Sequence, residues 1–88
     1  MVKVTNTALL RLKRKLKRQP KGVAVRITVH DGHVQFRPDT EQNGDVVFSQ
    51  SGQTLLLVGA ETAEHISNRT LGVVRTVEGD RLRFVRPA

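Results

Sequence analysis

Residues 23–37 constrain the fold of this chain more than any other segment. Apolar and polar residues alternate along it on both sides of Asp31-Gly32, a dipeptide typical of two-residue hairpin turns. Such alternation is typical of strands that bury one face. The segment therefore predicts a β-hairpin that pairs His30 with His33, Val29 with Val34, Thr28 with Gln35, Ile27 with Phe36, and Arg26 with Arg37.

This register sorts the hairpin side chains into two faces. A shift by one residue would move the apolar side chains to the polar face, so the pattern itself specifies the register. The predicted core face holds Val25, Ile27, Val29, Val34 and Phe36, and the predicted outer face holds Arg26, Thr28, His30, His33, Gln35 and Arg37. Two arginines directly opposite each other cost stability, so an anion or acidic partner between them would favour the pair.

Length and composition indicate one small domain that covers residues 1–88. The chain contains no cysteine, which excludes a disulfide, a thiolate nucleophile and the usual ligands of an iron–sulfur cluster. No apolar run is long enough to span a membrane, and residues 1–6 lack the apolar segment of a secretory signal. We therefore expect a cytoplasmic protein with no membrane partner and no cofactor.

Positive charge is concentrated near the start of the chain. Residues 1–22 hold eight Lys or Arg and no acid, whereas residues 23–88 hold seven arginines and eight acids. An amphipathic helix is expected here, capped by Thr5, Asn6 or Thr7 and running to about Arg18, before Pro20 and Gly22. Its apolar arc consists of Ala8, Leu9, Leu12 and Leu16, and its basic side, which also contains Leu10, consists of Arg11, Lys13, Arg14, Lys15, Lys17 and Arg18.

The basic side of this helix has three interpretations. It can be the solvated outer side of a packed helix, or a surface that binds anions or nucleic acid through counterion release. An acid-free, basic, amphipathic start is also typical of a targeting presequence. The direct continuation through Lys21-Gly22 into the first long strand argues against a removable leader.

The remaining segments predict a mainly β domain with flanking helices, an α+β fold. We expect a polar loop over residues 38–45, strands over 46–48, 54–58, 71–77 and 82–85, and a short helix over 60–66. The unbroken run Leu55-Leu56-Leu57 predicts a strand buried on both faces. The last hairpin has two alternatives: a turn at Gly79-Asp80 that pairs Glu78 with Arg81, or a three-residue turn that places Val74 opposite Phe84 and Thr76 opposite Leu82.

Few residues are candidates for metal ligands or catalytic groups. His30 and His33 are the candidate metal ligands, but two imidazoles on an exposed turn are too few for a tight site. Ser49, Ser51 and Thr54 have no base at a motif spacing, and no phosphate-binding loop is present. We therefore expect no catalytic residues and no enzymatic activity.

Several motifs follow one another in a particular order. An extended Val2-Lys3-Val4, a polar cap and the helix lead through Lys21-Gly22 into Val25–Val29. Later come Asp45-Val46-Val47-Phe48, Ser51-Gly52, Leu55-Leu56-Leu57-Val58, Leu71–Val77, and Leu82-Arg83-Phe84-Val85-Arg86-Pro87. In this order they resemble the A-type iron–sulfur carriers, the HesB/IscA-like family. The family's closing Phe-x-Phe-x-Asn-Pro is represented with Leu82 for the first Phe and Arg86 for Asn.

The resemblance implies a distorted β-barrel or sandwich with helices beside it. The family places one cysteine in a loop between its first two long strands and two in a Cys-Gly-Cys tail. Here the loop is reduced to Asp31-Gly32 and the sequence stops at Ala88, so no residue inherits the cluster-binding role. The resemblance thus implies a non-enzymatic binding or scaffold module related to iron–sulfur cluster biogenesis that does not itself hold a cluster.

A protein partner is the expected ligand of such a module. The alternative is a nucleic-acid-binding protein that uses the basic helix. The residues predicted to contact a partner or anion are Arg11, Lys13, Arg14, Lys17 and Arg18 on the helix and Arg26 and Arg37 on the hairpin, with His30 and His33 on the same hairpin face.

Overall fold

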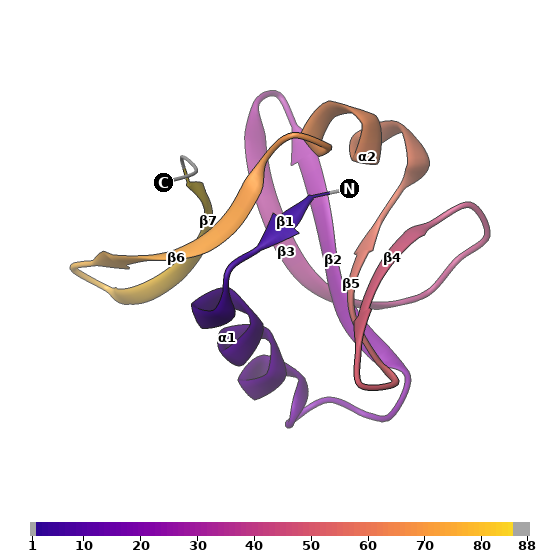
Figure 1. Ribbon diagram of the computed structural model, residues 1–88, viewed down its shortest axis with the longest axis horizontal. Helices are drawn as coiled ribbons and strands as arrows, with labels where there is room; N and C mark the ends of the chain where they lie inside the picture. The colour runs from indigo at the N-terminus through magenta and orange to yellow at the C-terminus, as the bar shows by residue number, and fades with distance from the viewer. Residues whose placement is uncertain (1, 86–88) are drawn as a thin grey trace.

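A computed structural model describes residues 2–85 and confirms a mainly β, α+β fold (Figure 1). The elements are β1 (Lys3–Val4), α1 (Asn6–Leu16), β2 (Val23–His30), β3 (His33–Thr40), β4 (Val46–Gln50), β5 (Gln53–Val58), α2 (Ala60–Ile66), β6 (Thr70–Thr76) and β7 (Gly79–Val85).

The strands form two separate sheets rather than a closed barrel. Within residues 2–85, one sheet has the order β1-β6-β7 and the other the order β3-β2-β5-β4. β1 runs parallel to β6, and β2 runs parallel to β5, while the remaining pairs are antiparallel. The sandwich expected from the resemblance is therefore open, with β7 and β3 as edge strands of different sheets.

The predicted register of the first hairpin is confirmed at every pair, from His30 opposite His33 to Arg26 opposite Arg37. Its turn places Asp31 at φ 50° and Gly32 at φ 78°. A two-residue turn with both φ angles positive matches the right-handed twist of the strands, which explains why Asp-Gly is found here.

Helix α1 begins where its sequence predicts a cap. The hydroxyl of Thr5 accepts a hydrogen bond from the Ala8 amide at 3.2 Å. Ala8, Leu12 and Leu16 are buried, whereas Leu10 is 59% exposed. The helix ends at Leu16, two residues before the predicted Arg18, because the Gln19 amide bonds to the Leu16 carbonyl at 3.1 Å, a tighter i to i−3 turn that closes the helix before Pro20.

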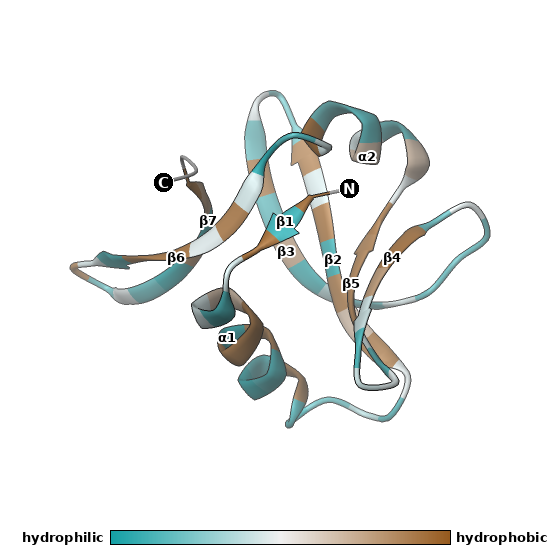
Figure 2. Cartoon of the chain, in the orientation of Figure 1, coloured by the Kyte–Doolittle hydropathy of each residue, from teal (hydrophilic) through white to brown (hydrophobic). Residues whose placement is uncertain are grey.

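The core lies between the two sheets and α1. Its fully buried side chains include Leu12, Ile27 and Leu71, together with Leu55, Leu56 and Leu57 of β5. Figure 2 shows the hydrophobic colour continuing along β5 and over much of β2, the two central strands of the four-stranded sheet. The prediction that β5 is buried on both faces is confirmed.

Two local predictions are wrong. The segment predicted as a loop from Pro38 continues β3 as far as Thr40, because Pro38 lies on an edge strand, where the missing amide costs no ladder bond. Neither predicted turn of the last hairpin occurs, since Thr76 pairs with Gly79. That register places Leu71 opposite Phe84 and Val73 opposite Leu82, the same-face apolar pairs that stabilise a sheet.

The tip of this last hairpin is held by one hydroxyl. The Thr76 hydroxyl donates to the Gly79 carbonyl at 2.8 Å and accepts from the Glu78 amide at 3.2 Å. Gly79 adopts φ 111°, which a residue with a Cβ rarely tolerates.

Within residues 2–85, no helix has the length and apolarity that crossing a membrane requires.

Candidate binding site

Arg26 lies in the interior, which corrects its predicted place on an outer face. It is 7% exposed, and its guanidinium donates from Nη2 and Nη1 to the two carboxylate oxygens of Asp45 at 2.6 and 3.0 Å. Nε donates to Asp39 Oδ2, and Nη2 also reaches the carbonyl of Thr40 at 3.3 Å. The acidic partner expected between the facing arginines is thus supplied by the chain itself.

Arg26 and its two carboxylate partners, Asp39 and Asp45, form a cluster in which the guanidinium and each carboxylate shift one another's pKa. The hydrogen bond with Asp45 is the main cause that raises the pKa of Arg26, and the hydrogen bond with Arg26 lowers the pKa of both Asp39 and Asp45. Through these four hydrogen bonds, Arg26 on β2 holds the end of β3 and the loop that contains Asp45. One sequence signal pointed to the pair: if the register is extended, Asp39 becomes the diagonal neighbour of Arg26 on the same face.

Arg37 is exposed, unlike Arg26 opposite it. Together with Lys15, it lines a small cleft of about 110 Å³ between α1 and β3. The structure therefore places Arg37 and Lys15 at the same cleft.

The basic side of α1 faces away from the core. Arg14, Lys15, Lys17 and Arg18 are exposed, and Arg11 and Lys13 are half-buried. Within residues 2–85, none of these side chains forms an ion pair with a carboxylate. The four exposed cations of this surface are therefore open to solvent or to a ligand.

The two hairpin histidines point to solvent. The side chain of His30 is 87% exposed and lies 3.5 Å from the Asp31 carboxylate. No group of three or more His, Cys, Asp or Glu side chains that could hold a metal ion occurs among the described residues. His33, also exposed, lines a larger cleft.

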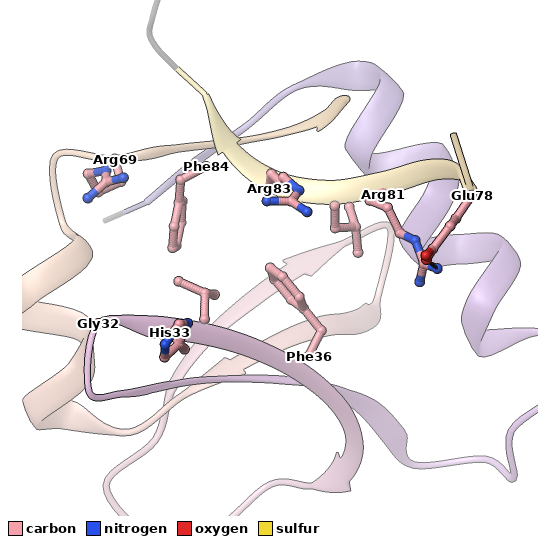
Figure 3. A pocket seen from close by; sticks show the side chains of 10 residues that line it. Gly32, His33, Phe36, Arg69, Glu78, Arg81, Arg83 and Phe84 are labelled. Atoms are coloured by element: carbon pink, nitrogen blue, oxygen red, sulfur yellow. Dashed lines mark hydrogen bonds and ion pairs between the residues drawn. The ribbon is translucent and has the colours of Figure 1, made fainter. Parts of the chain in front are cut away.

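This larger cleft, of about 630 Å³, was not predicted from the sequence. It lies between β3 and β7, the edge strands of the two sheets, and we call it the β3–β7 cleft. Figure 3 shows Phe84 extending from β7 and Phe36 from β3 toward each other across it. The lining residues are Gly32, His33, Val34, Phe36, Arg69, Glu78, Arg81, Leu82, Arg83 and Phe84.

Three arginines and a single carboxylate give the cleft a positive charge. Arg81 donates to Glu78 at 2.9 Å, so this pair is nearly neutral. The guanidinium of Arg69 lies 5.0 Å from the centre of the Phe84 ring, a cation–π distance. Arg83 has no ion-pair partner within residues 2–85. The cleft thus combines an apolar floor with two guanidiniums, those of Arg69 and Arg83, that no carboxylate of residues 2–85 neutralises.

The fold of this chain is similar to that of several solved structures. Escherichia coli SufA, which is involved in biosynthesis of iron–sulfur clusters, matches with a TM-score of 0.80 and 22% identity over 98% of this chain and 85% of SufA. IscA with a [2Fe–2S] cluster matches with a TM-score of 0.65 and 21% identity over 99% of this chain and 86% of IscA. The chain has the SufA/IscA fold.

A protein from Aquifex aeolicus has this fold as well, with a TM-score of 0.68 and 22% identity over 98% of this chain and 91% of its own. No protein-family model and no curated protein matches the sequence. The resemblance noted in the sequence is confirmed at the level of the fold. Arg86 and Pro87 of the proposed closing motif lie outside the described residues.

An iron–sulfur cluster does not fit the residues that this chain offers. Protein ligands of such clusters are chiefly cysteine thiolates, and the sequence has none. In the β3–β7 cleft, His33 and Glu78 are the lining residues of ligand type, and Glu78 is already paired with Arg81. Guanidiniums at the same cleft would repel iron cations. The SufA/IscA fold is therefore present without the donor set for a cluster.

Proposed function

We propose that this chain is a non-enzymatic binding module of iron–sulfur cluster biogenesis that holds no cluster itself. The observation that carries this proposal is the match to SufA along 98% of the chain, in a sequence without cysteine. A fold can be retained after its metal ligands are lost if its surface still recognises a protein. What the chain contributes is then recognition, and its partner contributes the chemistry.

Two experiments test this function. Anaerobic incubation with ferrous iron, sulfide and a thiol should leave the protein colourless after desalting. Stoichiometric iron and sulfide in the desalted protein would contradict the proposal. Crosslinking of a tagged chain in cells, with mass spectrometry, should enrich proteins that assemble or receive clusters, and an enrichment confined to ribosomal proteins would contradict it as well.

Nucleic-acid binding is a second candidate, and one observation favours it. Four cations at the end of α1 and just after it stay exposed and unpaired with carboxylates in the described part of the chain, as a phosphate-binding surface requires: Arg14, Lys15, Lys17 and Arg18. If this candidate is correct, affinity for a short RNA or DNA duplex falls steeply with salt. The double variant Arg14→Gln/Lys17→Gln should then lower the salt slope by about one for each phosphate that it no longer neutralises. No binding at low salt would eliminate this candidate.

A further inference from the structure

We propose that the β3–β7 cleft is the docking site for an acidic segment of a partner protein, with an apolar side chain seated between Phe36 and Phe84. This inference rests on the proposed function in one respect, namely that the ligand is a protein. It adds the place of contact and the chemistry of the bound segment.

The floor of the cleft requires an apolar ligand group. Val34, Phe36, Leu82 and Phe84 line it from two different sheets, and Val34 remains 36% exposed. Phe36 and Phe84 face each other without closing the gap (Figure 3). A leucine or phenylalanine side chain placed there would remove apolar surface of both sheets from water, which is the main source of affinity at such sites.

The rim requires negative charge. Arg69 lies in the loop between α2 and β6, and Arg83 lies on β7. Neither forms an ion pair with a carboxylate of residues 2–85, and Arg81 is paired with Glu78. A guanidinium binds a carboxylate through two parallel hydrogen bonds, which fixes both orientation and charge. Two or three acidic side chains beside the apolar group would satisfy this rim.

The strand arrangement favours an extended peptide. β3 pairs only with β2 and β7 only with β6 among the described strands, so each wall of the cleft has a free backbone edge. Peptides commonly bind by adding a strand to such an edge. Arginines on β7 discourage pairing with a second positively charged edge of the same kind, but they complement an acidic strand.

Free phosphate or nucleic acid explains these features less well. Phosphate binding requires cations but not four apolar side chains between two sheets. The basic side of α1 offers cations at higher density and without an apolar floor. The mixture of apolar floor and arginine rim is what distinguishes the β3–β7 cleft from that helix.

The experiment uses a short fluorescein-labelled peptide that alternates Glu with Leu and Phe, and measures its binding by fluorescence anisotropy at low salt. Arg83→Gln should weaken binding about tenfold, as expected for removal of a charge-assisted hydrogen bond. Arg75→Gln is the control, because Arg75 is an arginine on β6 that does not line the cleft, with a side chain that is 91% exposed and 3.8 Å from the carboxylate of Asp80. It should change affinity less than about twofold.

The apolar contact has its own pair of variants. Val34→Ser should weaken binding several-fold, whereas Val29→Ser should not, although Val29 is opposite Val34 and is similarly exposed at 39%. A peptide with Ser in place of Leu and Phe should lose affinity for the wild-type protein. A peptide with Lys in place of Glu should not bind.

Several outcomes would overturn the proposal. If Arg14→Gln on α1 weakens peptide binding as much as Arg83→Gln, the peptide responds to overall charge and not to the cleft. If a single-stranded RNA competes with the peptide and depends on Arg83, the ligand of the cleft is nucleic acid. Absence of peptide binding would refute the docking site, while the iron-loading and crosslinking experiments would still decide the proposed function separately.

Discussion

Arginines occupy two contrasting environments in this molecule. Arg26 is buried and surrounded by its own carboxylates, with Asp45 bound through both oxygens and Asp39 through Nε. Arg69 and Arg83 line the open β3–β7 cleft, and neither forms an ion pair with a carboxylate of residues 2–85. The first environment uses a guanidinium to hold chain segments together. The second leaves guanidiniums free for a ligand.

The contrast shows how to separate structural from functional charge in a basic protein. A buried cation must be paired, because leaving it unpaired costs several kcal/mol. An exposed cation in a cleft has no such need and can persist without a partner. Substituting a buried, paired arginine should therefore change stability, whereas substituting an exposed arginine of the cleft should change binding.

The largest change in the free energy of unfolding is expected for Arg26→Met. Removal of the guanidinium leaves Asp45, whose side chain is only 5% exposed, without its partner, and should lower the free energy of unfolding by about 3 kcal/mol. Urea denaturation followed by circular dichroism measures this decrease. Arg37→Met is the control, because Arg37 is opposite in register but exposed, and should stay within about 0.5 kcal/mol of wild type. Equal decreases would show that the Arg26 cluster is not structural.

A smaller loss of folding stability is expected when the pH is lowered into the acid range. The pKa values of Asp39 and Asp45 are lowered by Arg26, so their stabilising contribution is complete above the unfolded pKa, about 3.9, and is lost as pH falls through the lower folded values. Between about pH 5 and 9, this cluster should add no pH dependence.

Asp45→Asn tests the assignment. It should cost about 2 kcal/mol at neutral pH because the charge-assisted hydrogen bonds are removed, and it should flatten the decline in melting temperature below about pH 4. Melting curves of wild type and variant across the acid range measure both effects. A variant that declines as steeply as wild type would place the acid-sensitive group elsewhere.

The smallest effect is expected for Arg83→Gln in the absence of ligand. Neutralising one of the cleft cations relieves mutual repulsion, so stability should rise by a few tenths of a kcal/mol at low salt. High salt screens the repulsion and should abolish the difference. Thermal denaturation at two salt concentrations measures this. A decrease above about 1 kcal/mol would mean that Arg83 has a structural role like that of Arg26.

Elements determined by local sequence were predictable. Asp31-Gly32 specifies the turn, and the alternation beside it specifies the register, so the first hairpin is correct pair by pair. The capping hydroxyl of Thr5 and the apolar spacing of α1 likewise depend on neighbouring residues only. The successive leucines of β5 identified a strand with two buried faces, again from local pattern.

Features that depend on distant segments were missed. The sequence predicts Arg26 on the outer face, because alternation shows which residues share a face but not whether both faces are covered. That face of Arg26 is covered by Asp39 and Thr40 at the end of β3 and by Asp45 in the loop that follows. The β3–β7 cleft arises from the relative placement of two sheets, which no local pattern reports. Whether α1, Arg37 or the cleft contacts a partner remains a prediction for the experiments above.

The parallel pairing of β1 with β6 also has a consequence for biosynthesis. Lys3 aligns with Thr70 and Val4 with Leu71, so the three-stranded sheet joins segments from opposite ends of the described sequence. During translation, β1 has no partner until β6 has emerged from the ribosome, whereas the β2–β3 hairpin can form as soon as its own residues are free. We expect α1 and β1 to dock last, which hydrogen exchange on stalled nascent chains would detect as late protection of the Thr5 amide that bonds to the Leu71 carbonyl.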